Sequence, residues 1–297
     1  MKIRKAVVPA AGLGTRHFPA SHAVKKELFP VVGPDGIARA LMHYHLLDLL
    51  AAGLEEVCLI VQPGDEETFR HYFAGPAPDY LARLAKYPEL QAEARAMQEV
   101  AARIHYVTQP TQDGYGHAFF QSRAFAAGEP VLLCLGDHLF RGGSASCPAQ
   151  MLAAFDRKPG RSLSAVNRIA PAELRGYGTV AGRRFPDDPD LIDVTRIIEK
   201  PAVDVARREL RVDGLGDDEF LGWFGMHILL PSIYDILAGM IRDEVRDGGE
   251  FQLTRAQEIQ RGREGYHALE IRDGKRYDFG IPADFVRSVY EFSQPEI

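Results

Sequence analysis

The feature that most constrains this chain is the alternation, in its first half, of short apolar runs with amphipathic segments. The runs are nearly continuous and lie at residues 5–9, 57–62, 104–108 and 131–136. Runs of this kind suit strands of a parallel sheet that is covered on both faces. Helical patterns lie between or beside the runs, at residues 38–52, 66–73, 80–103 and 116–126. Because strands that alternate with helices make right-handed crossovers, we predict an α/β fold with a doubly wound, mostly parallel, Rossmann-like mixed sheet and helices on both faces.

The second half of the chain has a different pattern. Strands are predicted at residues 163–168, 179–184, 194–198 and 266–271, and helices at 231–240, 252–261 and 282–292. The regular alternation of the first half is lost, and residues 184–189 are polar and proline-rich, which indicates a loop. We therefore predict one domain with a smaller C-terminal portion.

Composition narrows the class of protein. A length of 297 residues allows one large domain or two small ones. The net charge of −6 argues against a nucleic-acid binder, which normally carries a basic face. No apolar run reaches the roughly 18 residues of a membrane span, and no signal peptide is recognisable. The three widely spaced cysteines, Cys58, Cys134 and Cys147, fit small buried residues in a reducing compartment. We expect a cytoplasmic protein that binds neither nucleic acid nor membranes.

A glycine-containing loop follows the first predicted strand. It reads Pro-Ala-Ala-Gly-Leu-Gly-Thr-Arg over residues 9–16, and its small residues would let backbone N–H groups approach a phosphate. Arg16 adds a forked, permanently charged donor. A dinucleotide fingerprint would need a third glycine where His17 stands, and a Walker A loop is absent. Gly12 and Gly14 taken alone fit a tight turn equally well. The candidate nucleotide-binding residues of this loop are Ala10, Ala11, Gly12, Gly14 and Thr15.

The position of this loop on the predicted sheet points to a ligand site. Ligands on doubly wound sheets bind beyond the carboxyl ends of the strands. Three loops follow such ends, at residues 10–26, 109–116 and 136–140. We expect these three loops to share one rim.

The segment after Arg16 carries a family resemblance. Residues 25–31 read Lys-Lys-Glu-Leu-Phe-Pro-Val, so that Gly-x-Gly-Thr-Arg is followed by Lys-Glu-x-x-Pro-Val. This order resembles the sugar-nucleotide pyrophosphorylases, and among them the bacterial glucose-1-phosphate uridylyltransferases. Lys26 matches the family lysine that contacts phosphate. Two positions depart from the family: Lys25 stands where proline is frequent, and His22 where lysine is common. The simpler interpretation of Lys25 is a solvated charge.

Two further motifs in the first half match the same family. The segment at residues 109–118, Gln-Pro-Thr-Gln-Asp-Gly-Tyr-Gly-His-Ala, is similar to the loop that reads the base. The resemblance assigns Gln109 to the pyrimidine edge and Gly114 to its ring face. An amide both donates and accepts, which suits the O4 and N3–H edge of uracil. Asp137 corresponds to a metal-binding aspartate, whereas His138 is unusual there and fits capping or packing as well as substrate contact.

The second half continues the resemblance in the same order. Tyr177 and Gly178 resemble the sugar-contacting Tyr-Gly turn, and Glu199-Lys200-Pro201 matches the signature whose glutamate holds sugar hydroxyls and whose lysine holds the sugar phosphate. Residues 249–254, Gly-Glu-Phe-Gln-Leu-Thr, resemble a segment that opens a late helix. Asp278 matches the second metal aspartate.

The resemblance implies a reaction. Mg²⁺ held by Asp137 and Asp278 would assist in-line attack of glucose 1-phosphate on UTP, giving UDP-glucose and pyrophosphate. Arg16 would stabilise the leaving pyrophosphate, Lys26 the triphosphate and Lys200 the sugar phosphate. The whole chain would form a single nucleotidyltransferase domain, with residues 1–140 binding nucleotide and residues 141–297 binding sugar. A homo-oligomer, a dimer or a tetramer, is also expected.

Three alternatives stay open at this point. The same chemistry could use dTTP or another sugar 1-phosphate. A non-catalytic protein that binds a sugar nucleotide would be expected to lack one of the four residues Arg16, Lys26, Asp137 and Asp278, and all four are present. A glycosyltransferase would usually carry Asp-x-Asp at its metal strand, where residues 136–139 hold a single aspartate.

Overall fold

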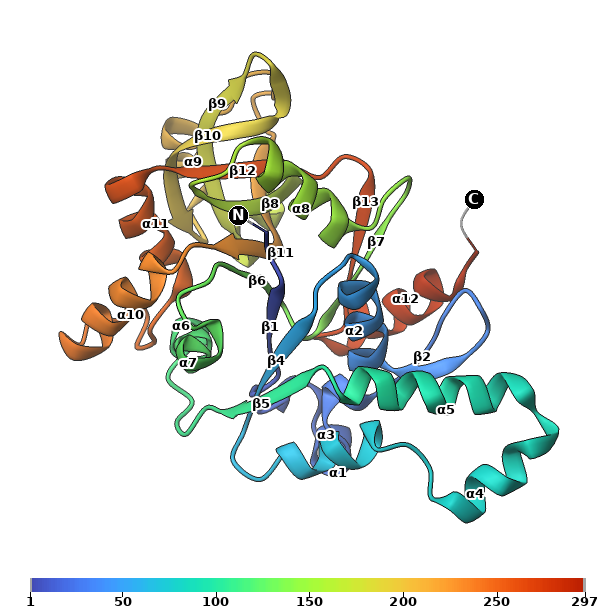
Figure 1. The fold of residues 1–297 in the computed structure, drawn as a ribbon. Coiled ribbons are helices and arrows are strands. Elements are labelled where there is room, and N and C mark those ends of the chain that lie inside the picture. Colours follow the sequence, from blue (N-terminus) through green and yellow to red (C-terminus); the bar gives the residue numbers. More distant parts are fainter. Residues whose placement is uncertain (1, 296–297) are drawn as a thin grey trace.

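The structure is a computed structural model that describes residues 2–295, apart from the side chain of residue 84. Its centre is one nine-stranded sheet in the order β5-β4-β1-β6-β11-β8-β12-β10-β9 (Figure 1). These strands are β1 (Lys5–Pro9), β4 (Glu56–Val61), β5 (Ile104–Thr108), β6 (Val131–Cys134), β8 (Ser162–Ile169), β9 (Gly178–Phe185), β10 (Asp188–Glu199), β11 (Phe220–Leu229) and β12 (Tyr266–Glu270).

The first half of the chain forms the parallel part of the sheet. Strand β1 pairs in parallel with β4 on one side and β6 on the other, and β4 pairs in parallel with β5. The four predicted strands are therefore confirmed. Their carboxyl ends lie at one edge, so the loops that follow them share one rim, as expected.

The second half makes the sheet mixed. Strand β11 pairs antiparallel with both β6 and β8, and β10 pairs antiparallel with β12 and β9, while β8 and β12 are parallel. The mixed character is confirmed, but parallel pairing dominates only in the first half. The predicted loop at residues 184–189 is shorter than expected, because the hairpin between β9 and β10 leaves only residues 186 and 187 outside the strands.

Helices cover both faces of the sheet, which confirms the doubly wound arrangement. One face of the sheet packs against α2 (Leu41–Ala51), α3 (Glu66–Phe73), α5 (Pro88–Ala101) and α8 (Cys147–Arg157). The other face packs against α6 (Tyr115–Phe120), α7 (Arg123–Ala126), α10 (Ser232–Arg242) and α11 (Leu253–Glu264). The alternation of side chains along β1 shows the same division: Ala6 and Val8 join the first core and Val7 the second.

Two small ribbons lie beside the main sheet. Strands β2 (Pro30–Val32) and β3 (Ala38–Ala40) form one, and β7 (His138–Gly142) and β13 (Gly274–Asp278) form the other. Strand β3 takes the residues that were predicted to start a helix, so α2 begins only at Leu41. The remaining helices are α1 (Ala20–Ala23), α4 (Pro78–Arg83), α9 (Val203–Glu209) and α12 (Pro282–Ser293).

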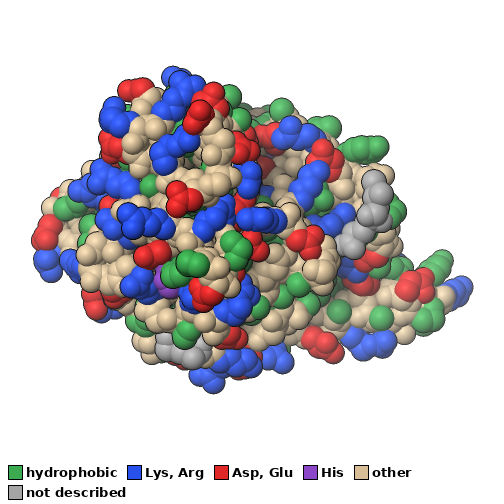
Figure 2. Space-filling view, turned by 90° about the horizontal axis from the view of Figure 1, so that it is seen from above, with side chains coloured by type: hydrophobic (Ala, Val, Ile, Leu, Met, Phe, Trp, Pro, Cys, Tyr) green, Lys and Arg blue, Asp and Glu red, His purple; other side chains and the backbone are tan. Residues whose placement is uncertain are grey.

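An arm made of α4 and α5 projects from the body of the molecule (Figures 1 and 2). It replaces the single helical stretch predicted near residues 80–103, and Pro88 stands in the first turn of α5. The root of the arm is tied to the body by Arg39, whose Nε and Nη2 both donate to the carboxylate of Glu93. Such a bidentate pair fixes orientation as well as distance.

Three features of the structure relate to the expectations drawn from composition: the distribution of surface charge, the state of the cysteines and the length of the apolar helices. On the face seen in Figure 2, lysine and arginine side chains lie interspersed with aspartate and glutamate side chains. Cys58, Cys134 and Cys147 are buried and free. Within the part of the chain that the structure describes, none of the helices is both long and apolar enough to cross a bilayer.

Candidate active site

The glycine loop after β1 offers unpaired backbone donors. The N–H of Ala10 donates to Ile60 O (2.7 Å), which anchors the loop to β4. Among the described residues, the N–H groups of residues 11–14 donate to no protein acceptor. Gly14 has φ +67°, a left-handed conformation that glycine adopts without strain. Consecutive free N–H groups around such a turn form a nest for an anion.

A cavity of about 420 Å³ lies beside this loop, at the carboxyl ends of the parallel strands. It brings together residues from all three predicted rim loops. The predicted site residues that line it are Ala11, Gly12, Lys26, Gln109, Gly114 and Asp137, and Glu27, Gln112 and Glu250 join them.

Three predicted nucleotide-binding residues, Ala10, Gly14 and Thr15, lie outside that cavity. Ala10 is buried beneath the loop. Thr15 lines a neighbouring hollow of about 650 Å³, together with His22 and Lys25. Lys25 pairs with Asp65 at 2.7 Å, so its charge is not simply solvated. Arg16 is exposed and forms no ion pair with any described residue, which leaves its guanidinium available to an anion.

Lys26 contacts the predicted metal-binding aspartate. Its Nζ donates to Asp137 Oδ2 at 2.6 Å and lies 3.7 Å from Glu27 Oε1. Burial alone would lower the pKa of Lys26, but the carboxylates of Asp137 and Glu27 outweigh it and the pKa is raised. Lys26 therefore carries its charge throughout the physiological range.

The two predicted metal aspartates lie close together. Strand β13 pairs with β7 in a register that sets Asp278 directly opposite His138, next to Asp137. A methyl group built on Gly280 would lie 2.9 Å from Asp137 Oδ2 and 3.0 Å from Asp278 Oδ1, so both oxygens flank one point. The N–H of Gly280 donates to Asp278 Oδ1 (2.7 Å), which orients that carboxylate.

His138 lies between these carboxylates. Its Nδ1 is 2.8 Å from Asp137 Oδ1 and its Nε2 is 3.5 Å from Asp278 Oδ2. Burial opposes protonation of the ring, but Asp137 and Asp278 together raise the pKa of His138. Burial likewise opposes ionisation of Asp137, yet His138 and Lys26 hold its pKa well below the usual range. The sequence left two interpretations of His138 open, packing and substrate contact. In the structure the ring of His138 contacts the two aspartates.

The donor set fits a divalent cation of the Mg²⁺ type. In the described residues no group of three or more His, Cys, Asp or Glu side chains could enclose a metal ion. Two carboxylates flanking one point match a cation that takes few protein ligands and completes its shell with phosphate oxygens. Lys26 and His138 would have to release carboxylate oxygens when such a cation binds.

The base-reading candidate, Gln109, is buried at the wall of the cavity. It follows β5 directly, and its backbone N–H donates to Val61 O (2.9 Å), the last residue of β4. Its Nε2 lies 3.3 Å from Gly114 O and 3.3 Å from Nδ1 of His117. Gly114 has φ +103°, and a side chain there would meet Glu250 Cβ at 2.7 Å, so both conformation and space require glycine.

The sugar-binding candidates gather around a second cavity, of about 580 Å³, which Glu199 and Lys200 line. Glu199 lies opposite Gly178 in the β9–β10 hairpin, and Thr254 Oγ1 donates to Glu199 Oε2 at 2.7 Å. The N–H of Lys200 donates to Tyr177 O (3.1 Å). Lys200 has φ +45°, an uncommon conformation for a residue with a side chain and one that clusters at functional sites.

One segment, residues 247–252, contributes to both cavities. Asp247 and Gly248 line the cavity of Glu199 and Lys200, named here the sugar cavity, and Glu250 lines the cavity beside the glycine loop, named here the nucleotide cavity.

Several residues of the site were not assigned roles from the sequence. Glu27 belongs to the Lys-Glu-x-x-Pro-Val motif, but only the fold shows that its side chain is buried beside the cavity. Arg276 donates to the hydroxyl of Tyr177 and stacks 4.5 Å from the centre of its ring. Thr254 lies in the first turn of α11, and its hydrogen bond to Glu199 shows that it orients this carboxylate.

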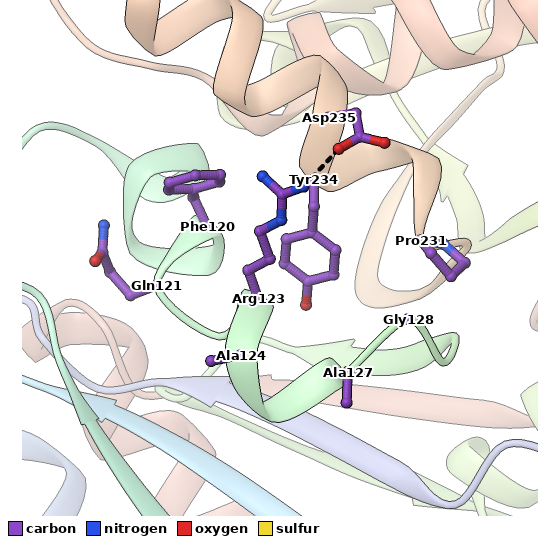
Figure 3. A pocket seen from close by; sticks show the side chains of 9 residues that line it. All are labelled: Phe120, Gln121, Arg123, Ala124, Ala127, Gly128, Pro231, Tyr234 and Asp235. Carbon is purple, nitrogen blue, oxygen red and sulfur yellow. Dashed lines mark hydrogen bonds and ion pairs between the residues drawn. The ribbon is translucent and has the colours of Figure 1, made fainter.

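A fourth space, also of about 650 Å³, lies away from this rim (Figure 3). It sits between α7 and α10, beside residues 127–128, which precede the amino end of β6. An ion pair between Arg123 and Asp235 (2.7 Å) crosses it. It contains none of the residues predicted for the site, so we place the chemistry at the carboxyl ends of the strands.

The fold and site define a protein in which a loop with free backbone N–H groups and a pair of carboxylates lie at the same edge of a doubly wound sheet. The chain belongs to the nucleotidyl transferase family, whose model matches residues 5–247. It is 30% identical to UTP–glucose-1-phosphate uridylyltransferase 1 of Staphylococcus saprophyticus over 99% of this chain and 93% of that protein. It is 29% identical to the UTP–glucose-1-phosphate uridylyltransferase of Bacillus subtilis, over 99% and 92%.

Solved structures agree with the sequence relatives. A UDP-glucose pyrophosphorylase complexed with UDP-glucose superposes with a TM-score of 0.78 and 25% identity, covering 98% of both chains. The family resemblance and the fold class expected from the sequence are thus confirmed.

Proposed function

We propose that this protein transfers the uridylyl group of UTP to glucose 1-phosphate, releasing pyrophosphate and forming UDP-glucose, with Mg²⁺ as the cofactor. The observation that carries the proposal is the cluster of Lys26, Asp137, His138 and Asp278 beside the free N–H groups of the glycine loop. Full-length similarity to enzymes named for this reaction supports the substrates.

The reaction needs no proton transfer from the protein. The second pKa of a sugar phosphate is near 6, by analogy with phosphorylated side chains, so its oxygen is an anionic nucleophile at neutral pH. That oxygen forms a bond to the α-phosphorus of UTP while the bond to the α,β-bridging oxygen breaks, and pyrophosphate leaves. The difficulty is the meeting of two polyanions. A bound Mg²⁺ would supply charge neutralisation and orientation of the phosphates.

The residues of this chain would divide the electrostatic task. The glycine loop and Arg16 would hold the β- and γ-phosphates that depart, and Lys26 would turn from Asp137 to the triphosphate. Lys200, at the mouth of the sugar cavity, would bind the phosphate of glucose 1-phosphate, and Glu199 its hydroxyls. Asp137 and Asp278 would hold Mg²⁺ through one carboxylate each.

We also propose that the chain is one nucleotidyltransferase domain whose two halves bind different substrates, as expected from the sequence. Gly12, Lys26 and Gln109 support a nucleotide-binding role for residues 1–140, and Glu199 and Lys200 a sugar-binding role for residues 141–297. Glu250 is an exception, because it lies in the second half and lines the nucleotide cavity. A homo-oligomer stays a prediction that light scattering on the purified protein tests.

The test is pyrophosphate release from purified protein with Mg²⁺, over a panel of nucleoside triphosphates and sugar 1-phosphates. UTP with glucose 1-phosphate should give the highest kcat/KM, and EDTA should abolish the signal. A higher value with dTTP or another sugar 1-phosphate would transfer the proposal to that substrate. Binding of UDP-glucose without turnover of any pair would instead support a non-catalytic sugar-nucleotide protein.

A further inference from the structure

The single tryptophan of the chain, Trp223, carries a polar atom without a partner beside the sugar-binding candidates. Trp223 belongs to β11 and is only 7% exposed. Its indole Nε1 is buried and donates to no acceptor among the described residues. Because native proteins leave few buried donors unpaired, this N–H group calls for an explanation.

The strand register places Trp223 and Glu199 on either side of one glycine. Gly178 in β9 pairs with Glu199 in β10. Strand β9 also pairs with β11, where Thr179 lies opposite Gly222, and the next step of this antiparallel register brings Trp223 opposite Gly178. Directly paired residues point to the same face of a sheet. The side chains of Trp223 and Glu199 therefore share one face, and Gly178 places no side chain between them.

The missing side chain of Gly178 is what lets these two groups approach each other. A methyl group built on Gly178 would lie 2.4 Å from Nε1 of Trp223 and 2.9 Å from Oε2 of Glu199. Of the three atoms nearest to that point, Oε2 is the only acceptor. The unpaired indole N–H and the carboxylate thus flank the same point.

The two carboxylate oxygens of Glu199 have different surroundings. Oε2 accepts from Thr254 Oγ1 (2.7 Å) and keeps a lone pair for a second donor. Oε1 lies 3.7 Å from Nζ of Lys200, and the side chain of Glu199 is 32% exposed, which leaves it room to turn. Two donors on Oε2 would fix the carboxylate and leave Oε1 to accept from a ligand.

We infer that Trp223 is a positioning residue of the sugar site: its indole N–H donates to Oε2 of Glu199 when a sugar 1-phosphate binds, and it fixes the carboxylate that accepts from the sugar hydroxyls. This inference rests on the proposed function, because it takes Glu199 and Lys200 as sugar-binding residues. The phosphate of the sugar draws Lys200 away from Oε1. The carboxylate then turns toward the indole while it keeps the bond from Thr254.

The first test uses the fluorescence of the wild type, in which the only tryptophan signal comes from Trp223. The protein is titrated in Mg²⁺ with UDP-glucose and, separately, with UDP. UDP-glucose should change the emission, because its sugar reaches Glu199 and the indole N–H gains an acceptor. UDP has no sugar to place there and should leave the emission nearly unchanged.

The second test removes the donor. Trp223→Phe keeps an aromatic ring beside Gly178 but has no N–H. Tyr234→Phe is the matched control, because Tyr234 is also a buried aromatic residue, and its hydroxyl bonds to Ser122 Oγ (2.8 Å) at the hollow of Figure 3, away from the sugar site. The readouts are the KM values for glucose 1-phosphate and UTP, the calorimetric affinities for UDP-glucose and UTP, and the midpoint of thermal unfolding.

The loss of one hydrogen bond to a charged acceptor predicts that Trp223→Phe raises the KM for glucose 1-phosphate and weakens UDP-glucose by about 10-fold, with both values for UTP within about 2-fold of the wild type. Tyr234→Phe should lower the unfolding midpoint and leave the KM values unchanged. In a Glu199→Ala background, Trp223→Phe should weaken UDP-glucose by less than about 2-fold more, because the indole acts through that carboxylate.

The competing explanation is that the indole only covers a strand glycine. An unchanged affinity of folded Trp223→Phe for UDP-glucose supports that explanation and overturns the inference. An equal loss with UTP and UDP-glucose does the same, as does an emission that UDP changes as much as UDP-glucose. The proposed function fails separately: a wild type that binds UDP-glucose but releases no pyrophosphate refutes the transfer reaction, and the affinities still decide the role of Trp223.

Discussion

Replacing Gly280 by alanine puts a methyl group between the two carboxylates of the proposed metal site. The added carbon would stand 2.9 Å from Asp137 Oδ2 and 3.0 Å from Asp278 Oδ1. Comfortable non-bonded separations are about 3.5 Å, so each oxygen must retreat by about half an ångström. Metal sites tolerate deviations of only about 0.2 Å in ligand distance. The backbone of Gly280 is outside the left-handed region, so alanine adds no backbone strain there.

We expect this change to weaken the metal dependence more than the fold. Perturbing the orientation of metal ligands typically costs about 10- to 100-fold in metal affinity or activity, which is about 1.4 to 2.8 kcal/mol. The carboxylates are side-chain ends that can yield, so the free energy of unfolding should fall by less than about 1 kcal/mol. The ratio of the two effects distinguishes a metal site from general packing damage.

The assay is an Mg²⁺ titration of pyrophosphate release at saturating UTP and glucose 1-phosphate, with Mn²⁺ binding followed by electron paramagnetic resonance as a readout without turnover. Gly262→Ala is the matched control, because Gly262 is exposed within α11 and an added methyl meets nothing within 4 Å. It should raise stability by up to about 1 kcal/mol and leave the Mg²⁺ requirement unchanged. If Gly280→Ala needs no more Mg²⁺ than the wild type, the two aspartates are not a joint metal site.

Three further predictions concern the other parts of the site. Burial raises the pKa of Glu27 to about 7, from 4.5. Because the folded state favours the protonated form of Glu27, the free energy of unfolding of the wild type should fall, relative to that of Glu27→Gln, by up to about 3 kcal/mol between pH 4.5 and 7. Urea unfolding of both proteins at pH 5 and 8 measures this difference. An equal change of the unfolding free energy with pH in both proteins would contradict it. Lys200→Ala should raise the KM for glucose 1-phosphate at least tenfold and that for UTP little, with Lys200→Arg in between; a defect confined to UTP would move Lys200 to the other substrate. Gln109→Ala should weaken UTP by about 5- to 150-fold and leave the KM for pyrophosphate in the reverse reaction nearly constant; an unchanged nucleotide preference would place base reading elsewhere.

The parallel half of the fold was predictable because its signals are local. An apolar run such as residues 57–62 can only be a buried strand or a buried helix, and its length and flanking loops select the strand. The loops after these strands then share a rim by topology alone. For the same reason the sequence alone placed the glycine loop, Lys26 and Gln109 at one edge of the sheet, beyond the carboxyl ends of the parallel strands.

Strand β11 was missed although all ten of its residues are buried. Its sequence, Phe-Leu-Gly-Trp-Phe-Gly-Met-His-Ile-Leu, contains two glycines and a histidine and shows neither strand nor helix periodicity. Burial on both faces removes the need for alternation, and Gly222 and Gly225 are required by close contacts with Ile169 and Leu135 from other elements. Such contacts do not exist until the sheet is assembled.

The sequence by itself determined which chemical groups we propose for the site, since motif order along the chain selects Lys26, Gln109, Asp137, Lys200 and Asp278 without reference to distance. Only the tertiary structure decided how these groups act on one another. The β7–β13 register brings Asp278 to His138, and the loop after β5 sets Gln109 against His117. Electrostatic and hydrogen-bond energies depend on separations of a few ångströms between residues far apart in the chain, and those separations are set by the packing of the whole sheet.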